Sequence, residues 1–169
     1  MADINITKQH IKIGDLSKPP GNIPTGVWQL RAISLKQRGR TVNFKDGEKE
    51  SVEYTLAMEP IAPTESVDPE ALADLDPMTG RPTYDGKRLF LRYTLAFANE
   101  MRQLASALQA MGFTDTDDFQ DVVENERVKG RTAYGEIFNR SYPKNDGSTG
   151  VEQKVKGWAS SATAGAVEL

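Results

Sequence analysis

Two segments of this sequence alternate apolar and polar side chains with a period of two, and this pattern constrains the fold more than any other feature. In residues 52–59 the alternating apolar positions are Val52, Tyr54, Leu56 and Met58. In residues 87–95 they are Leu89, Leu91, Tyr93 and Leu95. Because successive side chains of a strand point to opposite faces, both segments are predicted to be strands with one buried face.

Further elements are predicted before and after these two strands. Residues 26–35 indicate a strand whose alternation slips near Ala32, which is typical of a bulge. A polar segment over residues 36–40 comes next, followed by residues 41–44. Residues 45–48 contain Asp-Gly and are predicted to form a turn, since glycine accepts positive φ.

Helices and a closing hairpin are predicted in the second half of the chain. One helix has apolar residues at helical spacing and ends at Gly112; its inward side chains are Met101, Leu104, Ala105, Leu108 and Met111. A shorter helix begins near Thr116 and directs inward Phe119, Val122 and Val123. Residues 129–139 and 151–158 indicate two strands joined by a turn over residues 142–150.

The predicted order is strand, strand, strand, helix, strand, strand. This is the element order of the OB-fold, a five-stranded Greek-key barrel in which a helix joins the third and fourth strands. We therefore expect a mainly β protein, a β-barrel with connecting helices. An open α+β sheet built from the same elements is the structural alternative.

Three regions are expected along the chain. Residues 1–25 form an N-terminal arm, with a short edge strand at residues 11–13 and a proline-rich end. Residues 26–158 form the barrel domain, and residues 159–169 a flexible C-terminal tail. Within the domain, residues 60–86 contain five prolines and are expected to be a long acidic loop outside the core, acting as a lid or a partner contact.

The net charge of −3 is unevenly distributed. Residues 59–85 contain seven acids and one base, and residues 115–126 contain six acids and no base. Each segment thus carries six net negative charges, and the rest of the chain carries nine net positive ones. Such segregation can create a positive face that attracts polyanions, although the acidic segments can equally be solvated loops and helix ends.

The residues needed for catalysis or metal binding are scarce. The chain has no cysteine, and its only histidine, His10, lies in the expected arm. Phosphate-binding glycine motifs are absent from the sequence. An acidic cluster lacks the pattern of a calcium loop and is better explained by a helix N-terminus; it comprises Asp115, Asp117, Asp118 and Asp121. We expect no catalytic site, no metal and no cofactor.

The sequence contains no apolar run of membrane-spanning length and no secretory signal pattern at its start. The absence of cysteine suits a reducing compartment. We therefore expect a cytoplasmic protein without a membrane partner, located in the host cytoplasm if the chain is encoded by a phage.

Basic and aromatic residues are interleaved at strand positions, a pattern that suits single-stranded nucleic acid because bases stack on aromatic rings while cations follow the phosphates. In the third strand, Arg88, Phe90 and Arg92 are predicted to face outward together. The other candidate binding residues are Arg31, Lys36, Arg38, Arg40, Lys129, Arg131, Arg140, Tyr142, Lys144, Lys154, Lys156 and Trp158.

Four of the aromatic residues have alternative interpretations. Phe90 could be covered by the arm or by the long loop, and Trp158 could close one end of the barrel instead of facing a ligand. Trp28 and Tyr54 are expected in the core.

The stretch from Gly26 to Trp158 resembles OB-fold single-stranded DNA-binding proteins encoded by bacteriophages. The similar segments are PTGVWQLRAI, GKRLFLRYTL, LASALQAMGF and VKGRTAYGEIFNRSYPKNDG followed by VKGW. The resemblance implies binding of single-stranded DNA, or RNA, without strong sequence preference, in phage DNA replication or recombination. Self-association and contacts with replication or recombination proteins are further expected. An acidic C-terminal tip recruits partners in many such proteins, whereas this tail has only Glu168.

A second hypothesis assigns the chain to another functional class. It would be a non-catalytic structural or adaptor protein of a phage particle or assembly, whose OB-like barrel contacts only protein. The proline-rich arm and the acidic loop would suit subunit contacts under either hypothesis.

Overall fold

The structure is a computed structural model that describes Ile13 and residues 20–161. Most of the expected arm lies outside the described residues, including residues 11 and 12 of the expected edge strand. The tail from residue 162 onward also lies outside them.

One antiparallel sheet organises the described chain. Its strands are β1 (Gly26–Phe44), β2 (Gly47–Pro63), β3 (Leu89–Thr94), β4 (Thr132–Pro143) and β5 (Thr149–Ala159). They are hydrogen-bonded in the order β3-β2-β1-β4-β5. The helices are α2 (Pro69–Leu72), α3 (Ala98–Ala110) and α4 (Phe119–Glu124). The expected mainly β architecture is confirmed, and a helix does lie between the third and fourth strands.

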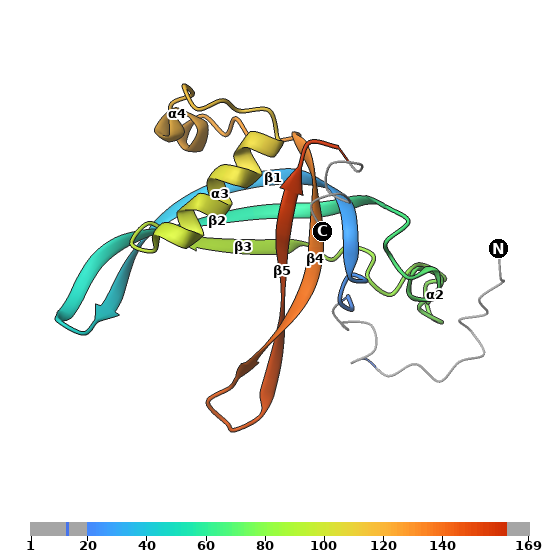
Figure 1. Ribbon diagram of the computed structural model, residues 1–169. Helices are drawn as coiled ribbons and strands as arrows, with labels where there is room; N and C mark the ends of the chain where they lie inside the picture. The colour runs from blue at the N-terminus through green and yellow to red at the C-terminus, as the bar shows by residue number, and fades with distance from the viewer. Residues whose placement is uncertain (1–12, 14–19, 162–169) are drawn as a thin grey trace.

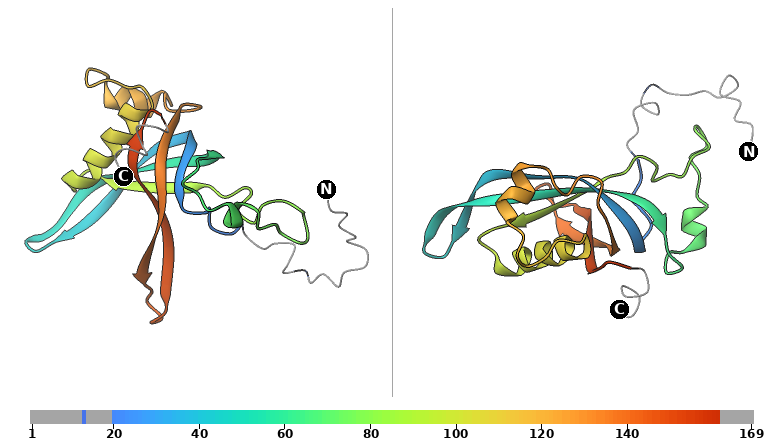
Figure 2. Two further views of the ribbon diagram at one scale, coloured as in Figure 1. Left: turned by 45° about the vertical axis from the view of Figure 1, so that its right-hand side comes forward. Right: turned by 90° about the horizontal axis from the view of Figure 1, so that it is seen from above.

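The sheet is strongly coiled, so its two ends face each other. In Figure 1, β4 and β5 cross β1, β2 and β3 steeply, and α3 lies along the same side of these three strands as β5. The two views of Figure 2 show the same arrangement, with the β1–β2 and β4–β5 hairpins projecting in different directions. The core fills the space between the two sets of strands and α3.

β1 is longer than predicted. The predicted strand does not end at residue 35, because the polar segment 36–40 and residues 41–44 continue it to a length of 19 residues. Arg38 pairs with Glu53 and Arg40 with Ser51 across β2, so their polar side chains are compatible with an exposed strand. The expected irregularity near Ala32 is confirmed by a register shift between Ala32 and Ser34. The expected turn is also confirmed, and it precedes Gly47, whose φ is +124°.

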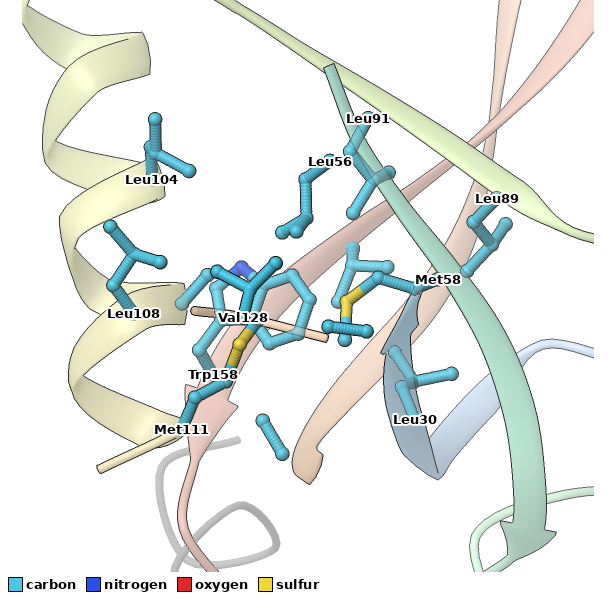
Figure 3. Packing of buried hydrophobic residues seen from close by; sticks show 14 of the residues in the cluster. Leu30, Leu56, Met58, Leu89, Leu91, Leu104, Leu108, Met111, Val128 and Trp158 are labelled. Carbon is cyan, nitrogen blue, oxygen red and sulfur yellow. The ribbon is translucent and has the colours of Figure 1, made fainter. Parts of the chain in front are cut away.

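The large buried apolar side chains of β2, β3 and α3 come from the predicted inward faces, whereas two residues that were predicted to face inward are exposed. Figure 3 shows Leu56, Met58, Leu89 and Leu91 directed toward Leu104 and other residues of α3. Leu95 was expected to be inward but is exposed, because β3 ends at Thr94 and the alternation of faces ends with the strand.

The second of these exposed residues lies on α3, whose buried face is rotated slightly from the expected one. Ala105 is exposed and Ala107 is buried. The predicted helix end at Gly112 is confirmed by its φ of +100°.

The expectation that residues 60–86 lie outside the core is wrong at both ends of that segment. Residues 60–63 belong to β2, and the side chain of Val67 is 2% exposed within the core. The Ser66 hydroxyl accepts a hydrogen bond from the backbone N–H of Val27 (2.8 Å). The ring of Tyr84 packs edge-on against Trp28, with centroids 5.5 Å apart. This segment therefore covers the beginning of β1, which would otherwise leave backbone groups without partners.

In residues 20–161 no helix has the length and apolar character needed to cross a bilayer.

A substitution at Gly135 tests how closely β4 and β5 pack against each other over the core. A Cβ atom at Gly135 would lie 2.3 Å from Cγ1 of Val155 and 3.3 Å from the Trp158 ring. We expect Gly135→Ala to lower the free energy of unfolding by about 1–3 kcal/mol, the usual cost of overpacking. Chemical denaturation of the two proteins measures this difference.

The matched control is Gly39→Ala in β1, where an added Cβ meets no atom within 4 Å. Stability there should be unchanged or slightly higher, because alanine reduces the entropy of the unfolded chain. Equal effects of the two substitutions would contradict the packing at Gly135.

Candidate nucleic-acid interface

The outward residues of β3 lie where the alternation predicts. Leu89, Leu91 and Tyr93 are buried, whereas the Phe90 side chain is 60% exposed. The described residues therefore do not cover Phe90, contrary to the alternative that the long loop buries it. Arg88 and Arg92 on either side are also exposed, and neither forms an ion pair with a described residue.

The strand register extends this surface across β2 to β1, on the face turned away from the core (the outer face). Lys36 is paired with Thr55, and Thr55 is paired with Arg92. Since neighbouring strands lie about 4.8 Å apart, these two cations flank Thr55 at a backbone separation of about 10 Å. Ala57 is the cross-strand partner of Phe90, and its small side chain adds no bulk beside the ring.

A buried carboxylate holds two further arginines of the outer face. Glu53 is 4% exposed, and its Oε1 accepts a hydrogen bond from Nε of Arg38 (3.0 Å). Arg40 Nη1 lies 3.3 Å from Oε2 of Glu53 and donates to the Thr94 hydroxyl at 2.6 Å. One carboxylate thus orients two guanidinium groups and leaves one net positive charge. Glu53 was missed as a site residue because its partners are 13 and 15 residues away in sequence.

Arg31 has a carboxylate of its own, whereas Arg38 and Arg40 share one. Its Nη2 lies 2.5 Å from Oε1 of Glu59, its cross-strand neighbour on β2. Its charge is therefore balanced locally, and Arg31 contributes less to a positive surface than the pattern of basic residues predicted.

A groove of about 320 Å³ separates β3 from β5. Its walls are residues 87–93 and residues 151–155, with Glu100 and Gln103 from α3 and Asn22 completing it. The groove brings Arg88, Phe90 and Arg92 opposite Lys154, which the sequence places more than 60 residues away. Burial raises the pKa of the Tyr93 hydroxyl well above its usual value, so this group of the groove wall stays neutral.

The other candidate residues of β4 and β5 lie on the outer face of the projecting hairpin. Arg140 is 3.8 Å from Glu152, and Lys156 is 3.1 Å from Glu136. Lys144 belongs to the exposed turn between the strands. These residues lie along the β4–β5 hairpin, whose tip projects away from β1, β2 and β3 (Figure 1).

Aromatic rings accompany the cations on this hairpin. Lys156 Nζ lies 5.1 Å from the centre of the Phe138 ring. Tyr142 is paired with Gly150, where an added Cβ would lie 2.4 Å from the Tyr142 ring, so the ring rests directly on the opposite strand. Phe138 was missed by the sequence analysis, although it lies at the same alternate positions as Arg140 and Tyr142.

Trp158 is buried at 9% exposure, and its assignment as a binding residue is wrong. Lys156 is paired with Glu136 and Ala159 with Tyr134, so two residues of β5 lie opposite one residue of β4, which is one extra residue in β5. This bulge includes Gly157, whose φ is +62°, and it turns Trp158 to the core side of the sheet. Figure 3 shows its ring between α3 and the strands.

The region before β4 also differs from the prediction. The strand begins at Thr132, so Lys129 and Arg131 precede it instead of lying within it. The Arg131 guanidinium lies over the Phe113 ring at 3.9 Å, and its Nη1 donates to the carbonyl of Met111 (3.3 Å). Arg131 therefore holds the end of α3, whereas Lys129 is exposed in the turn.

The acidic residues before α4 have local partners. The Asp118 carboxylate caps the helix by accepting from the backbone N–H of Gln120 (3.0 Å). No cluster of three or more potential metal ligands occurs in the part of the chain that the structure describes. Trp28 and Tyr54 are buried, as predicted.

The chain matches no protein-family model, and a search of curated proteins found no significant match.

Glu53→Gln tests the buried carboxylate. The amide cannot form the charge-assisted hydrogen bonds that Arg38 and Arg40 make with Glu53. Because both arginines are largely exposed and can return to water, we expect a loss of about 1–2 kcal/mol in the free energy of unfolding. Chemical denaturation measures the loss. Glu50→Gln, on the exposed end of the same strand, is the matched control and should leave stability nearly unchanged.

Proposed function

We propose that this protein binds single-stranded nucleic acid, without strong sequence preference, through the outer face of β1, β2 and β3. The observation that carries the proposal is Phe90, a large aromatic side chain exposed between two arginines that form no ion pair with a described residue. Exposing such a ring to water has no benefit for folding, whereas it offers a base a surface on which to stack.

The surrounding charges support the same function. Arg88, Arg92 and Lys36 are exposed without acidic partners among the described residues, and the Glu53 cluster adds one further net charge. These groups can follow a phosphate backbone while Phe90 stacks on a base. Stacking and charge attraction do not distinguish one base from another, so the binding is expected to tolerate any sequence, in DNA or RNA.

We further propose that the coiled sheet is an OB-type Greek-key barrel. The strand order β3-β2-β1-β4-β5 and the position of α3 between β3 and β4 both support this assignment. In such a barrel β3 and β5 are neighbours, and here they form the two walls of one groove. Oligonucleotides bind OB-folds on the face of the second and third strands, which is the face that carries Phe90.

The biological role that we propose is accessory to DNA replication or recombination of a bacteriophage, in the cytoplasm of its host. It rests on the sequence resemblance to phage single-stranded DNA-binding proteins. Self-association and contacts with replication or recombination proteins belong to the same proposal.

Binding to oligo(dT) should weaken steeply with salt. Each neutralised phosphate contributes about 0.7 to the slope of log affinity against log salt concentration. We expect Arg92→Gln and Lys36→Gln each to lower the slope by about that amount, as measured by fluorescence titration at several salt concentrations. Arg102→Gln, on the exposed side of α3, should leave it unchanged. If oligo(dT) fails to bind even at low salt, the adaptor hypothesis replaces this proposal.

Phe90→Ala should weaken oligo(dT) binding by about 1–3 kcal/mol, because the substitution removes a stacking surface. The melting temperature should hardly change, since Phe90 is exposed and surface substitutions usually cost less than about 0.5 kcal/mol. Leu75→Ala is the matched control, because Leu75 is an exposed apolar residue in the connection between α2 and β3, outside the three strands of the interface. A Phe90→Ala protein that is strongly destabilised but binds normally would contradict the assignment of this face.

A further inference from the structure

A second depression lies between α3 and the segment leading into α4, and none of its residues belongs to the proposed nucleic-acid interface. It has a volume of about 290 Å³. Its apolar lining consists of Met101, Leu104, Leu108, Phe113, Phe119 and Val122. Ala105 also lines it and is exposed, so a small side chain leaves the middle of the groove open on the α3 side.

Carboxylates stand at the edge of this apolar groove. The Asp117 side chain accepts hydrogen bonds from the backbone N–H (2.7 Å) and the hydroxyl (3.3 Å) of Thr114. These bonds hold the pKa of Asp117 below its usual value. Asp115 accepts from the Gln109 amide at 2.8 Å. Neither carboxylate forms an ion pair with a described residue, although both line the groove.

The charge around the groove restricts what can occupy it. Arg127 pairs with Asp121 (2.8 Å), and Arg131 lies over the Phe113 ring. Residues 115–131 nevertheless carry six acids against three bases, so the net charge beside the groove is negative and a phosphate backbone is repelled there. The C-terminal residues 162–169 have Glu168 as their only ionisable side chain, and it has the same sign as the groove. An occupant must therefore combine apolar side chains with positive charge.

We propose that this groove docks a basic amphipathic helix of a partner protein. Two or three large apolar side chains on one face of that helix would fill the groove, while lysine or arginine residues beside them would meet Asp115 and Asp117. Helix-in-groove recognition uses this combination of apolar anchors for affinity and charge for specificity and encounter rate. The partner would thus be held on α3 and α4 while nucleic acid occupies the outer face of β1, β2 and β3.

The test uses the full chain and a labelled synthetic peptide of about 14 residues, in which leucines at helical spacing alternate with lysines. Fluorescence polarisation should show binding that weakens with salt, whereas the matched peptide with glutamate in place of lysine should not bind. Ala105→Trp, which fills the groove from an exposed helix position, should weaken binding at least about tenfold. Ser106→Trp, at an exposed neighbouring position outside the groove, should leave binding unchanged.

Three outcomes would overturn the proposal. They are absence of peptide binding, equal binding of the lysine and glutamate peptides, and equal binding by the Ala105→Trp and unsubstituted proteins. Sedimentation velocity adds a fourth: a self-associated form that Ala105→Trp dissociates would assign the groove to a second copy of this chain. Melting temperatures show that both tryptophan variants fold. The affinity of Ala105→Trp for oligo(dT) should remain unchanged. The experiment therefore distinguishes failure of the peptide-groove proposal from failure of the nucleic-acid proposal.

Discussion

β1 pairs with a different strand along each of its edges, and the rest of the structure depends on this double pairing. From Gly26 to Arg31 it is hydrogen-bonded to β4, and from Trp28 onward to β2. The register shift after Ala32 lies where β1 leaves β4 and continues with β2 alone. A bulge bends and twists its strand, so β1 can belong to both sets of strands that enclose the core. The segment containing Ser66 and Val67 protects the start of this strand, which explains why part of a proline-rich, acidic connection is buried.

The same coiling separates apolar residues from charged ones on each strand. The inner faces of β2 and β3 supply Leu56, Met58, Leu89 and Leu91 to the core, and their outer faces carry polar residues and Phe90. The arginines of this face do not contribute their full positive charge, because Glu53 and Glu59 balance part of it. The carboxylates also limit the conformations of Arg31, Arg38 and Arg40. A ligand meeting this face would therefore encounter some groups that are already oriented, together with Lys36, Arg88 and Arg92, which form no ion pair within residues 20–161.

The two proposed binding surfaces have opposite charge and opposite chemistry. The Phe90 surface is basic with an exposed ring, whereas the groove beside α3 is apolar with carboxylates at its edge. The net charge of −3 is small because strongly acidic segments and a basic remainder of the chain nearly cancel. The two surfaces separate these charges in space. A protein with such a division can attract a polyanion to one face and a cationic protein segment to another, without either competing for the same residues.

Local patterns in the sequence determined the elements whose neighbours lie close in the chain. Period-two alternation predicted β3 and the outward direction of Phe90, because the pleat of a strand leaves no other choice once Leu89 and Leu91 are buried. Helical spacing and Gly112 predicted α3 and its end. The mainly β architecture of the protein also followed from these patterns.

Tertiary structure alone decided the features that depend on distant partners or on a single inserted residue. The bulge at Gly157 reversed the direction of Trp158, because one extra residue exchanges the two faces of a strand. The pairing of Glu53 with Arg38 and Arg40 required β1 and β2 to lie in one particular register. Lys154 reached the groove opposite Arg92 only because the sheet coils until β3 faces β5. Alternation along a strand is a local property of the backbone, whereas register and coiling are set by packing between segments far apart in the chain.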